Sequence, residues 1–90
     1  MALDEKLKRE LRSRGHVLKP VVTIGSAGLS KAVMRELDLS LTHHELMKVK
    51  IAGGDRDQRA AIISSLCEAL GAELVQSIGH MALIYRPSPD

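Results

Sequence analysis

A loop of four small residues, Gly25-Ser26-Ala27-Gly28, is the part of this 90-residue chain best suited to chemistry. It lies between an apolar run, residues 21–24, and a stretch with helical periodicity that begins at Leu29. Glycine lets the chain turn tightly without obstructing a ligand, and the first N–H groups of the following helix have no partner within it. The helix dipole also attracts anions. The loop therefore predicts a phosphate site, although strand-to-helix turns also use glycine for conformational reasons alone.

Four lysines near this loop could neutralise phosphate charge. Residues 45–52 alternate with period two, which places Lys48 and Lys50 on the face opposite the apolar side chains of that strand. Lys19 and Lys31 flank the loop along the chain. We expect all four to contact a phosphate backbone. The alternative is that lysines on an exposed sheet face only keep that face solvated.

Further candidates for the same site are Arg56, Arg59, His43 and His44. The two arginines lie one turn apart at the start of an expected helix, where Asp55 and Asp57 could pair with them instead. The two histidines are adjacent, but no third ligand is in view. We therefore expect no metal site there, and hydrogen bonds to a ligand or to a helix end instead.

Positive charge is concentrated at the start of the chain. Residues 1–19 hold six basic and three acidic side chains, a local net charge of +3 in a chain whose total is +2. Pairs four residues apart with the acid first, such as Asp4 and Lys8, are typical of a solvated helix. If that helix lies beside the loop, the residues that join the site are Arg12, Arg14 and His16.

The composition excludes several functions. Tyr85 is the only aromatic residue, which excludes a nucleic-acid surface built on aromatic stacking platforms. Cys67 is the only cysteine, which excludes an intramolecular disulfide and a cysteine-based metal cluster and favours a reducing compartment. No serine has the context of a nucleophile elbow, and the glycine loop lacks the ending of a P-loop. We expect no enzymatic activity and no cofactor.

No apolar stretch approaches the length that spans a membrane, and charged residues begin at Asp4. We therefore expect a cytoplasmic protein that contacts no membrane. The length and the hydrophobic content of 44% suit one domain with a single aliphatic core.

Residues typical of helix ends predict where the helices that position these side chains begin and end. Leucines at every fourth position predict a first helix, which Gly15 ends as a left-handed C′ residue. Ser30 predicts the N-cap of a second helix. Asp55 and Gln58 form the pattern of a capping box for a third helix, which Gly71 closes.

The strands are predicted at residues 21–24, 45–52, 74–78 and 81–85, with Gly79-His80 as a tight hairpin turn. The order is then α-β-α-β-α-β-β, a single α/β domain over residues 1–90 with a four-stranded mixed sheet. Its core spans about residues 3–86, and residues 87–90 form a short tail.

One face of this sheet should stay partly open, because three helices cannot cover both faces of four strands. Lys48 and Lys50 would lie on that face, together with the apolar Leu46 and Ala52. Right-handed crossovers would bring the strand ends and the glycine loop to a common rim.

Several segments, in this order, resemble the CRM domain, the RNA-binding module of chloroplast splicing factors and of bacterial YhbY-type ribosome-maturation proteins. They are LKPVVTIGSAGL at residues 18–29, HHELMKVKI at 43–51, Asp55-Arg56, and the closing hairpin at 78–87. Together they cover nearly the whole chain, about residues 10–88.

The resemblance implies an RNA-binding fold similar to the C-terminal domain of translation initiation factor three. It implies a GxxG loop that approaches the RNA backbone, here Gly25-Ser26-Ala27-Gly28. Some family members place a lysine or arginine inside the loop, whereas Ser26 and Ala27 are uncharged, so binding here would depend on loop amides and neighbouring lysines. The implied partners are ribosomal RNA and the precursor of the large ribosomal subunit, with no DNA.

Two other functions stay open at this point. The chain could bind ribosomal proteins through Leu46 and Ala52, with the basic first helix as a rim. It could also be a regulatory domain that binds a small anion. Salt dependence and competition by RNA distinguish the first from RNA binding, and stabilisation by a phosphorylated ligand would favour the second.

Overall fold

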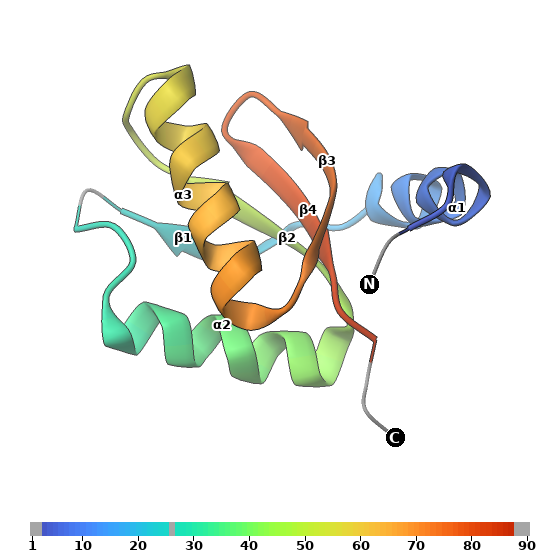
Figure 1. The fold of residues 1–90 in the computed structure, drawn as a ribbon, viewed down its shortest axis with the longest axis horizontal. Coiled ribbons are helices and arrows are strands. Elements are labelled where there is room, and N and C mark those ends of the chain that lie inside the picture. The colour runs from blue at the N-terminus through green and yellow to red at the C-terminus, as the bar shows by residue number, and fades with distance from the viewer. Residues whose placement is uncertain (1–2, 26, 88–90) are drawn as a thin grey trace.

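The computed structural model describes residues 3–25 and 27–87, and it has the α-β-α-β-α-β-β order that the sequence predicts (Figure 1). The elements are α1 (Glu5–Gly15), β1 (Pro20–Ile24), α2 (Lys31–His44), β2 (Leu46–Ile51), α3 (Arg56–Leu70), β3 (Glu73–Ile78) and β4 (Met81–Tyr85). The strands lie in the order β1-β2-β4-β3. β1 runs parallel to β2, and β4 runs antiparallel to both of its neighbours, which makes the predicted four-stranded mixed sheet.

Each helix begins at a residue whose side chain caps it. The Ser30 hydroxyl accepts a hydrogen bond from the Val33 N–H at 3.2 Å. Asp55 and Gln58 exchange two hydrogen bonds of 2.8 Å, which confirms the predicted capping box. A cap that the sequence analysis did not anticipate is Asp4, whose Oδ1 accepts from the N–H of Leu7 at 2.7 Å. The helix starts are therefore determined locally.

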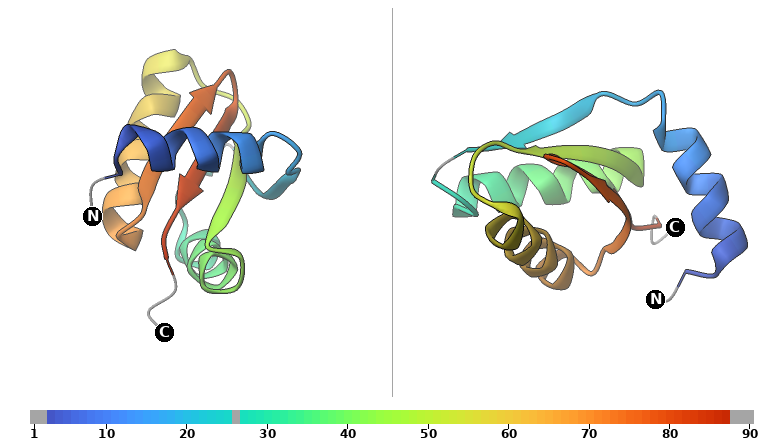
Figure 2. Two further views of the ribbon diagram at one scale, coloured as in Figure 1. Left: turned by 90° about the vertical axis from the view of Figure 1, so that its right-hand side faces the viewer. Right: turned by 90° about the horizontal axis from the view of Figure 1, so that it is seen from above.

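The main core lies between one face of the sheet and two helices, α2 and α3 (Figures 1 and 2). It is entirely aliphatic, as the composition requires. Its largest fully buried side chains are Ile24, Leu37, Leu41, Met47, Val49, Ile51, Leu66 and Ile84. Since alternate residues of β2 enter this core, the intervening Lys48 and Lys50 lie on the opposite face.

The first helix covers part of that opposite face. Leu11 of α1 is fully buried against Leu46, Val75 and Leu83, which come from three different strands. Figure 2 shows α1 crossing the strands on the side away from α2 and α3. Leu46 is only 5% exposed, so its prediction as an apolar residue of an open surface is wrong. The first helix buries it because a terminal amphipathic helix can bury its leucines only against an exposed apolar patch.

Gly15 ends α1 for a different reason from the predicted one. It is the last residue of the helix, its φ is not among the positive values, and the C-cap is His16 in a right-handed conformation. Gly15 is buried against β4, where a Cβ would come within 2.6 Å of Cδ1 of Leu83. The prediction of a left-handed C′ glycine is therefore wrong, and close packing explains the residue instead.

The turns that follow β1, β2 and β3 lie at the same end of the sheet, where these three strands terminate. The N–H of Ala52 donates to the carbonyl of Ile24 at 2.8 Å, which joins the ends of the two parallel strands. The N–H of Ile51 donates to the carbonyl of His80 at 2.7 Å, which joins the hairpin turn to the same end. The common rim expected from right-handed crossovers is thus formed.

In the two described ranges, no helix is both long enough and apolar enough to cross a membrane.

Candidate nucleic-acid interface

The shared end of the sheet carries a surface made largely of backbone, which we call the glycine rim: Gly25, Ala27, Gly28, Gly53 and Gly54. A hollow of about 510 Å³ lies between four of these residues, Ala52 just after β2, and the first turns of α3, where Gln58, Ala61 and Ile62 complete the lining. Among residues 3–25 and 27–87, no charged side chain lines this hollow. Ser26, the second residue of the predicted GxxG loop, lies outside the described residues. The glycine rim thus offers exposed backbone and open space to a ligand.

The two glycines of the loop differ in what the fold requires of them. Gly28 has φ +73° and donates from its N–H to the carbonyl of Gly25 at 3.0 Å, so its conformation favours glycine. Gly25 has no positive φ, and a Cβ there would meet nothing within 4 Å. The fold therefore tolerates a side chain at position 25, and glycine there leaves open space beside the backbone.

Both α2 and α3 begin at the glycine rim, but only one of them begins in a way that favours an anion. The first turn of α2 has no acidic residue, its cap is the neutral Ser30, and Lys31 follows directly. The first turn of α3 is capped by the carboxylate of Asp55 and also contains Asp57. Because a carboxylate repels a phosphate whereas the Ser30 hydroxyl is neutral, the start of α2 is the better anion site.

Lys48 and Lys50 connect the glycine rim with the open sheet face. Lys50 is exposed, pairs with Thr23 of β1 and lies one residue before the end of β2. Lys48 is half-buried and lies opposite Leu83 of β4. Two residues of a strand span about 7 Å, so the two ammonium groups emerge one step apart on a line toward the glycine rim.

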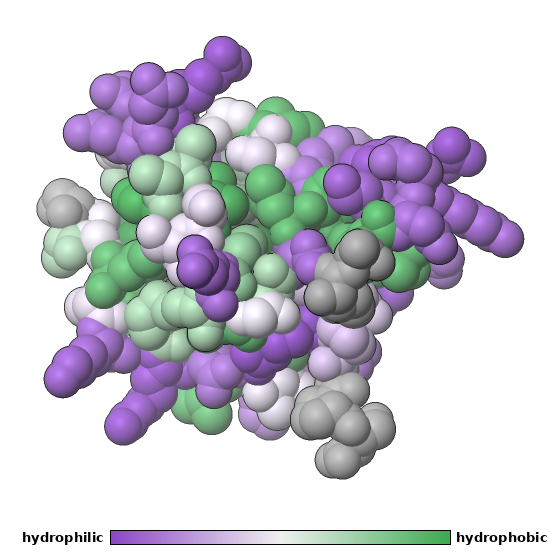
Figure 3. All heavy atoms as spheres, in the orientation of Figure 1, coloured by the Kyte–Doolittle hydropathy of each residue, from purple (hydrophilic) through white to green (hydrophobic). Residues whose placement is uncertain are grey.

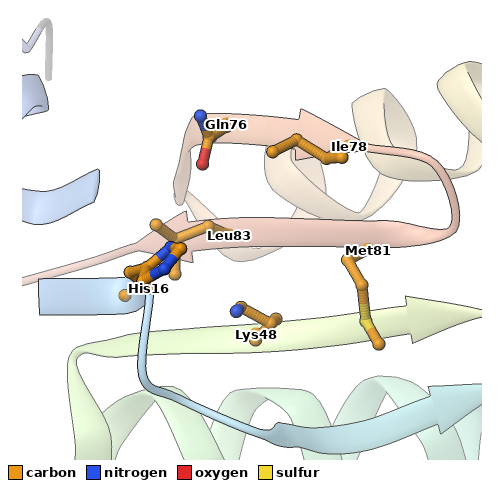
Figure 4. Close-up of a pocket in the computed structure, with 7 residues that line it drawn as sticks. His16, Lys48, Gln76, Ile78, Met81 and Leu83 are labelled. Atoms are coloured by element: carbon orange, nitrogen blue, oxygen red, sulfur yellow. The ribbon is translucent and has the colours of Figure 1, made fainter. Parts of the chain in front are cut away.

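A second hollow, of about 180 Å³, lies on the open face where α1 ends (Figure 4). We call it the sheet hollow. It is lined by Gly15, His16, Lys48, Gln76, Ile78, Met81 and Leu83. Figure 4 shows these side chains coming from β2, β4 and β3 and from the residue that follows α1. Gln76, Ile78 and Met81 were not predicted from the sequence as site residues.

A β-bulge explains why Gln76 lies on this face. Leu74 pairs with Ile84 and Gln76 pairs with Leu83, so Val75 is an extra residue between them. Val75 packs beneath α1, and Gln76 lines the sheet hollow on the same side of the sheet. A strict period of two would place these neighbours on opposite faces. No signal in the sequence alone marks this shift.

The structure brings only some of the predicted site residues together. Lys31 lies beside the glycine loop, and His16 lies with Lys48 in the sheet hollow. Arg12 and Arg14 lie on the last turn of α1, next to His16. The first helix therefore ends beside the open sheet face.

Three predicted residues lie at the opposite end of the sheet from the glycine rim. Lys19 precedes β1, so the length of that strand separates it from the loop. His43 and His44 are exposed at the end of α2, a helix of 14 residues that spans about 20 Å. A single phosphate cannot contact both these histidines and the glycine rim.

Arg56 and Arg59 lie in a third small hollow, of about 170 Å³, with Ser77 and Gly79. Nη1 of Arg59 donates to the carbonyl of Gly54 at 2.7 Å, which ties this guanidinium to the glycine rim. The carboxylate of Asp55 accepts from the N–H of Gln58.

Figure 3 shows hydrophilic residues gathered around the start of α3 and over α1, with apolar residues between them.

Cys67, on α3, is a free and partly buried cysteine. Burial, followed by the negative charge of Glu73, raises the pKa of its thiol from 9.0 to about 11. A protonated thiol is a poor nucleophile and a poor metal ligand. Within residues 3–25 and 27–87, no group of three or more histidine, cysteine or acidic side chains is placed to hold a metal ion.

Comparison with known proteins adds a family and a set of relatives. The family model of the CRS1 / YhbY (CRM) domain matches residues 3–86. The Probable RNA-binding protein PA4753 of Pseudomonas aeruginosa is 47% identical over 89 residues, covering 99% of this chain and 86% of that protein. An RNA-binding protein of Haemophilus influenzae is 43% identical over 88 residues, covering 98% of this chain and 89% of that protein.

The fold is also found among solved structures. The solution structure of the hypothetical protein SAV1595 from Staphylococcus aureus superimposes with a TM-score of 0.86 at 37% sequence identity. The match covers 99% of this chain and 93% of that one. The two named relatives carry RNA-binding names and not the names of enzymes.

Proposed function

The chain belongs to the CRS1 / YhbY (CRM) domain family, and from this premise we propose that it binds RNA through the glycine rim, Lys31, Lys48 and Lys50. Loop amides and the first N–H groups of α2 contact phosphate oxygens, and the three lysines neutralise neighbouring phosphates. Backbone contacts of this kind position the RNA without reading its sequence.

The observation that supports this proposal most strongly is Gly25. Its conformation does not require glycine, and a Cβ there would meet nothing within 4 Å. A glycine that the fold does not need, at the start of a loop beside an anion-ready helix, is explained by a ligand that approaches the backbone closely. The helix that follows the loop begins at Lys31, and Lys50 pairs with Thr23 just before the loop.

We further propose that the RNA is ribosomal, and that the chain acts in the cytoplasm in the assembly of the large ribosomal subunit. The support for this finer proposal is the resemblance to stand-alone YhbY-type proteins, which implies that role. Ribosomal RNA offers a dense phosphate surface with many structured turns, which suits a site that contacts backbone.

Sedimentation with ribosomal particles tests this proposal. The wild type is run on a sucrose gradient with a cell extract, beside the double variant Lys31→Glu/Lys50→Glu. A matched control is Lys6→Glu/Arg9→Glu, which makes the same change of net charge at two exposed residues of α1. Thermal melting verifies that both variants are folded.

We expect the wild type and the control to migrate with precursors of the large subunit, and the Lys31→Glu/Lys50→Glu variant to stay at the top. If wild type and both variants migrate alike, the glycine rim is not the site. If the wild type itself stays at the top but still binds RNA in isolation, the ribosomal part of the proposal fails and RNA binding stands.

A further inference from the structure

The sheet hollow is too small for a typical small-molecule ligand. Its volume is about 180 Å³, whereas pockets for such ligands span roughly 300–1,000 Å³. Its lining residues come from β2, β3, β4 and the end of α1 (Figure 4). A space of this kind accommodates one flat ring or one side chain.

The lining of the sheet hollow combines an apolar floor with polar groups at its edge. Leu83 and Met81 form the floor from β4, and Ile78 of β3 is 65% exposed beside them. The polar groups are the Gln76 amide and the Lys48 ammonium. An amide both donates and accepts hydrogen bonds, and an ammonium only donates.

This combination matches the chemistry of an unstacked nucleobase. A base has two apolar faces and a rim of hydrogen-bond donors and acceptors. The imidazole of His16 lies over the same hollow, and histidine is among the side chains on which unpaired bases stack. Tyr85 contributes nothing here, since it packs with the α1 cluster. The hollow is therefore distinct from an aromatic platform.

The position of the sheet hollow also suits RNA. Lys48 lines it, and Lys50 lies two residues further along β2 toward the glycine rim. Two residues of a strand span about 7 Å. An RNA backbone that binds the glycine rim and runs past Lys50 to Lys48 therefore reaches the hollow over one or two such distances. In the part of the chain that the structure describes, no acidic side chain lines the hollow.

A protein partner fits this surface less well. Lysine is depleted at the core of protein interfaces, where a half-buried ammonium would lose its hydration. Against RNA, Lys48 is complementary in charge. The apolar surface that the alternative of a protein-binding module required at Leu46 is covered by α1.

We propose that the sheet hollow holds one unpaired nucleobase of the bound RNA, with His16 stacked on the base, Gln76 and Lys48 at its edge, Leu83 and Met81 beneath it, and Ile78 beside it. This proposal rests on the proposed RNA-binding function and adds a subsite to it. The chain would then favour RNA in which a nucleotide is bulged out of a helix or lies in a loop.

Two RNA hairpins test this subsite. They are identical except that one has a single unpaired nucleotide in its stem, and fluorescence anisotropy gives the Kd of each. The variants are Gln76→Ala and Ile78→Asp. A matched control is Leu39→Asp, because Leu39 is 56% exposed on α2 and Ile78 is 65% exposed. All three residues are exposed, so folding is retained.

We expect the wild type to bind the bulged hairpin about tenfold more tightly than the paired one, a difference of about 1.4 kcal/mol. Ile78→Asp abolishes this preference, Gln76→Ala reduces it, and Leu39→Asp retains it. The ratio of the two Kd values cancels the general effect of the added charge. With 2-aminopurine as the unpaired base, emission changes on binding the wild type but not on binding Ile78→Asp.

Failure of this inference is distinct from failure of RNA binding. Equal affinity of the wild type for both hairpins overturns the subsite and leaves RNA binding intact. A preference that survives both variants shows that the base is held elsewhere and also overturns it. If the wild type binds neither hairpin, the proposed function itself fails. If Ile78→Asp keeps the preference but loses ribosomal particles, the hollow binds a protein.

Discussion

Gly15, the last residue of α1, lies directly against Leu83 of β4, and a Cβ at position 15 would come within 2.6 Å of Cδ1 of that leucine. This contact fixes where the first helix ends on the sheet. Because His16 follows immediately, the same contact places its imidazole over the sheet hollow. A structural glycine thereby determines the position of a candidate RNA-binding residue.

We predict that Gly15→Ala destabilises the protein, although alanine normally stabilises a helix. The added methyl group overpacks the contact with Leu83, which costs about 1–3 kcal/mol and exceeds the gain of about 0.5–1 kcal/mol from helix propensity. Urea denaturation measures the free energy of unfolding.

The pair Leu83→Ala and Leu83→Ala/Gly15→Ala is the control for this prediction. In the Leu83→Ala background the clash is removed, and Gly15→Ala should then stabilise by a few tenths to about 1 kcal/mol. The same sign of effect in both backgrounds would show that the two side chains are not coupled.

Arg86, just after β4, joins the two core helices. Its Nη1 donates to Oδ1 of Asp38 at 2.8 Å and to the carbonyl of Leu70 at 3.0 Å. Its Nη2 donates to the carbonyl of Asp38 at 3.0 Å and to the hydroxyl of Thr42 at 3.1 Å. One guanidinium therefore ties the middle of α2 to the end of α3.

We predict that Arg86→Ala lowers the free energy of unfolding by about 2 kcal/mol, because four acceptors lose a charged donor. Asp38→Ala should cost only about 0.5 kcal/mol, since the Asp38 carboxylate is exposed and Arg86 keeps its carbonyl acceptors. Arg35→Ala, at an exposed arginine of α2, serves as control and should change stability by less than about 0.5 kcal/mol. An equal cost for all three would contradict the assigned role of Arg86.

The sequence predicted the locally determined features of this fold well. All three helix caps act between residues three positions apart, and short patterns predicted two of them, Ser30 and the Asp55–Gln58 box. The face of Lys48 and Lys50 also followed correctly from the alternation of one strand.

Features that depend on distant parts of the chain could not be predicted in the same way. The extra residue at Val75 reverses the alternation of β3, and nothing in its neighbours marks a bulge. The burial of Leu46 depends on where α1 docks, and the hydrogen bonds of Arg86 reach residues up to 48 positions away. Single-sequence patterns contain no information on such contacts.

We predict that Gly25→Ala weakens RNA binding without weakening the fold. A Cβ there meets no atom within 4 Å, so the melting temperature should stay unchanged, while the methyl group occupies the space beside the loop backbone. Gly28→Ala should behave differently, losing about 1 kcal/mol of stability because of φ +73°. RNA affinity and thermal melting are measured on both variants. Wild-type affinity in a folded Gly25→Ala protein would exclude close approach at this residue.

RNA affinity should fall steeply with salt. If about three phosphates of single-stranded RNA are neutralised by Lys31, Lys48 and Lys50, a plot of log K against log salt has a slope near −2, and Lys50→Ala should reduce its magnitude by about 0.7. Gln76→Ala should leave the slope unchanged, since its contacts are not ionic. Filter binding at several salt concentrations gives these slopes, and a flat response of the wild type would contradict the phosphate site.

Cys67 should react slowly while the protein is folded. Burial and the charge of Glu73 raise the pKa of its thiol from 9.0 to about 11. At pH 8 the folded protein then holds roughly a hundredfold less thiolate than the unfolded chain, and only the thiolate attacks iodoacetamide. The rates are measured by mass spectrometry in buffer and in concentrated urea. Equal rates would mean that the thiol is not buried as described.

The same raised pKa gives a pH dependence of stability with a definite sign. Between about pH 9 and pH 11 the unfolded chain loses the thiol proton while the folded protein retains it. The folded state then binds more protons, so stability falls as the pH rises through this window. Cys67→Ser removes this titration and should flatten the dependence in that range, which urea denaturation at pH 8, 9 and 10 measures. If the wild type and Cys67→Ser lose stability in parallel, other groups cause the loss.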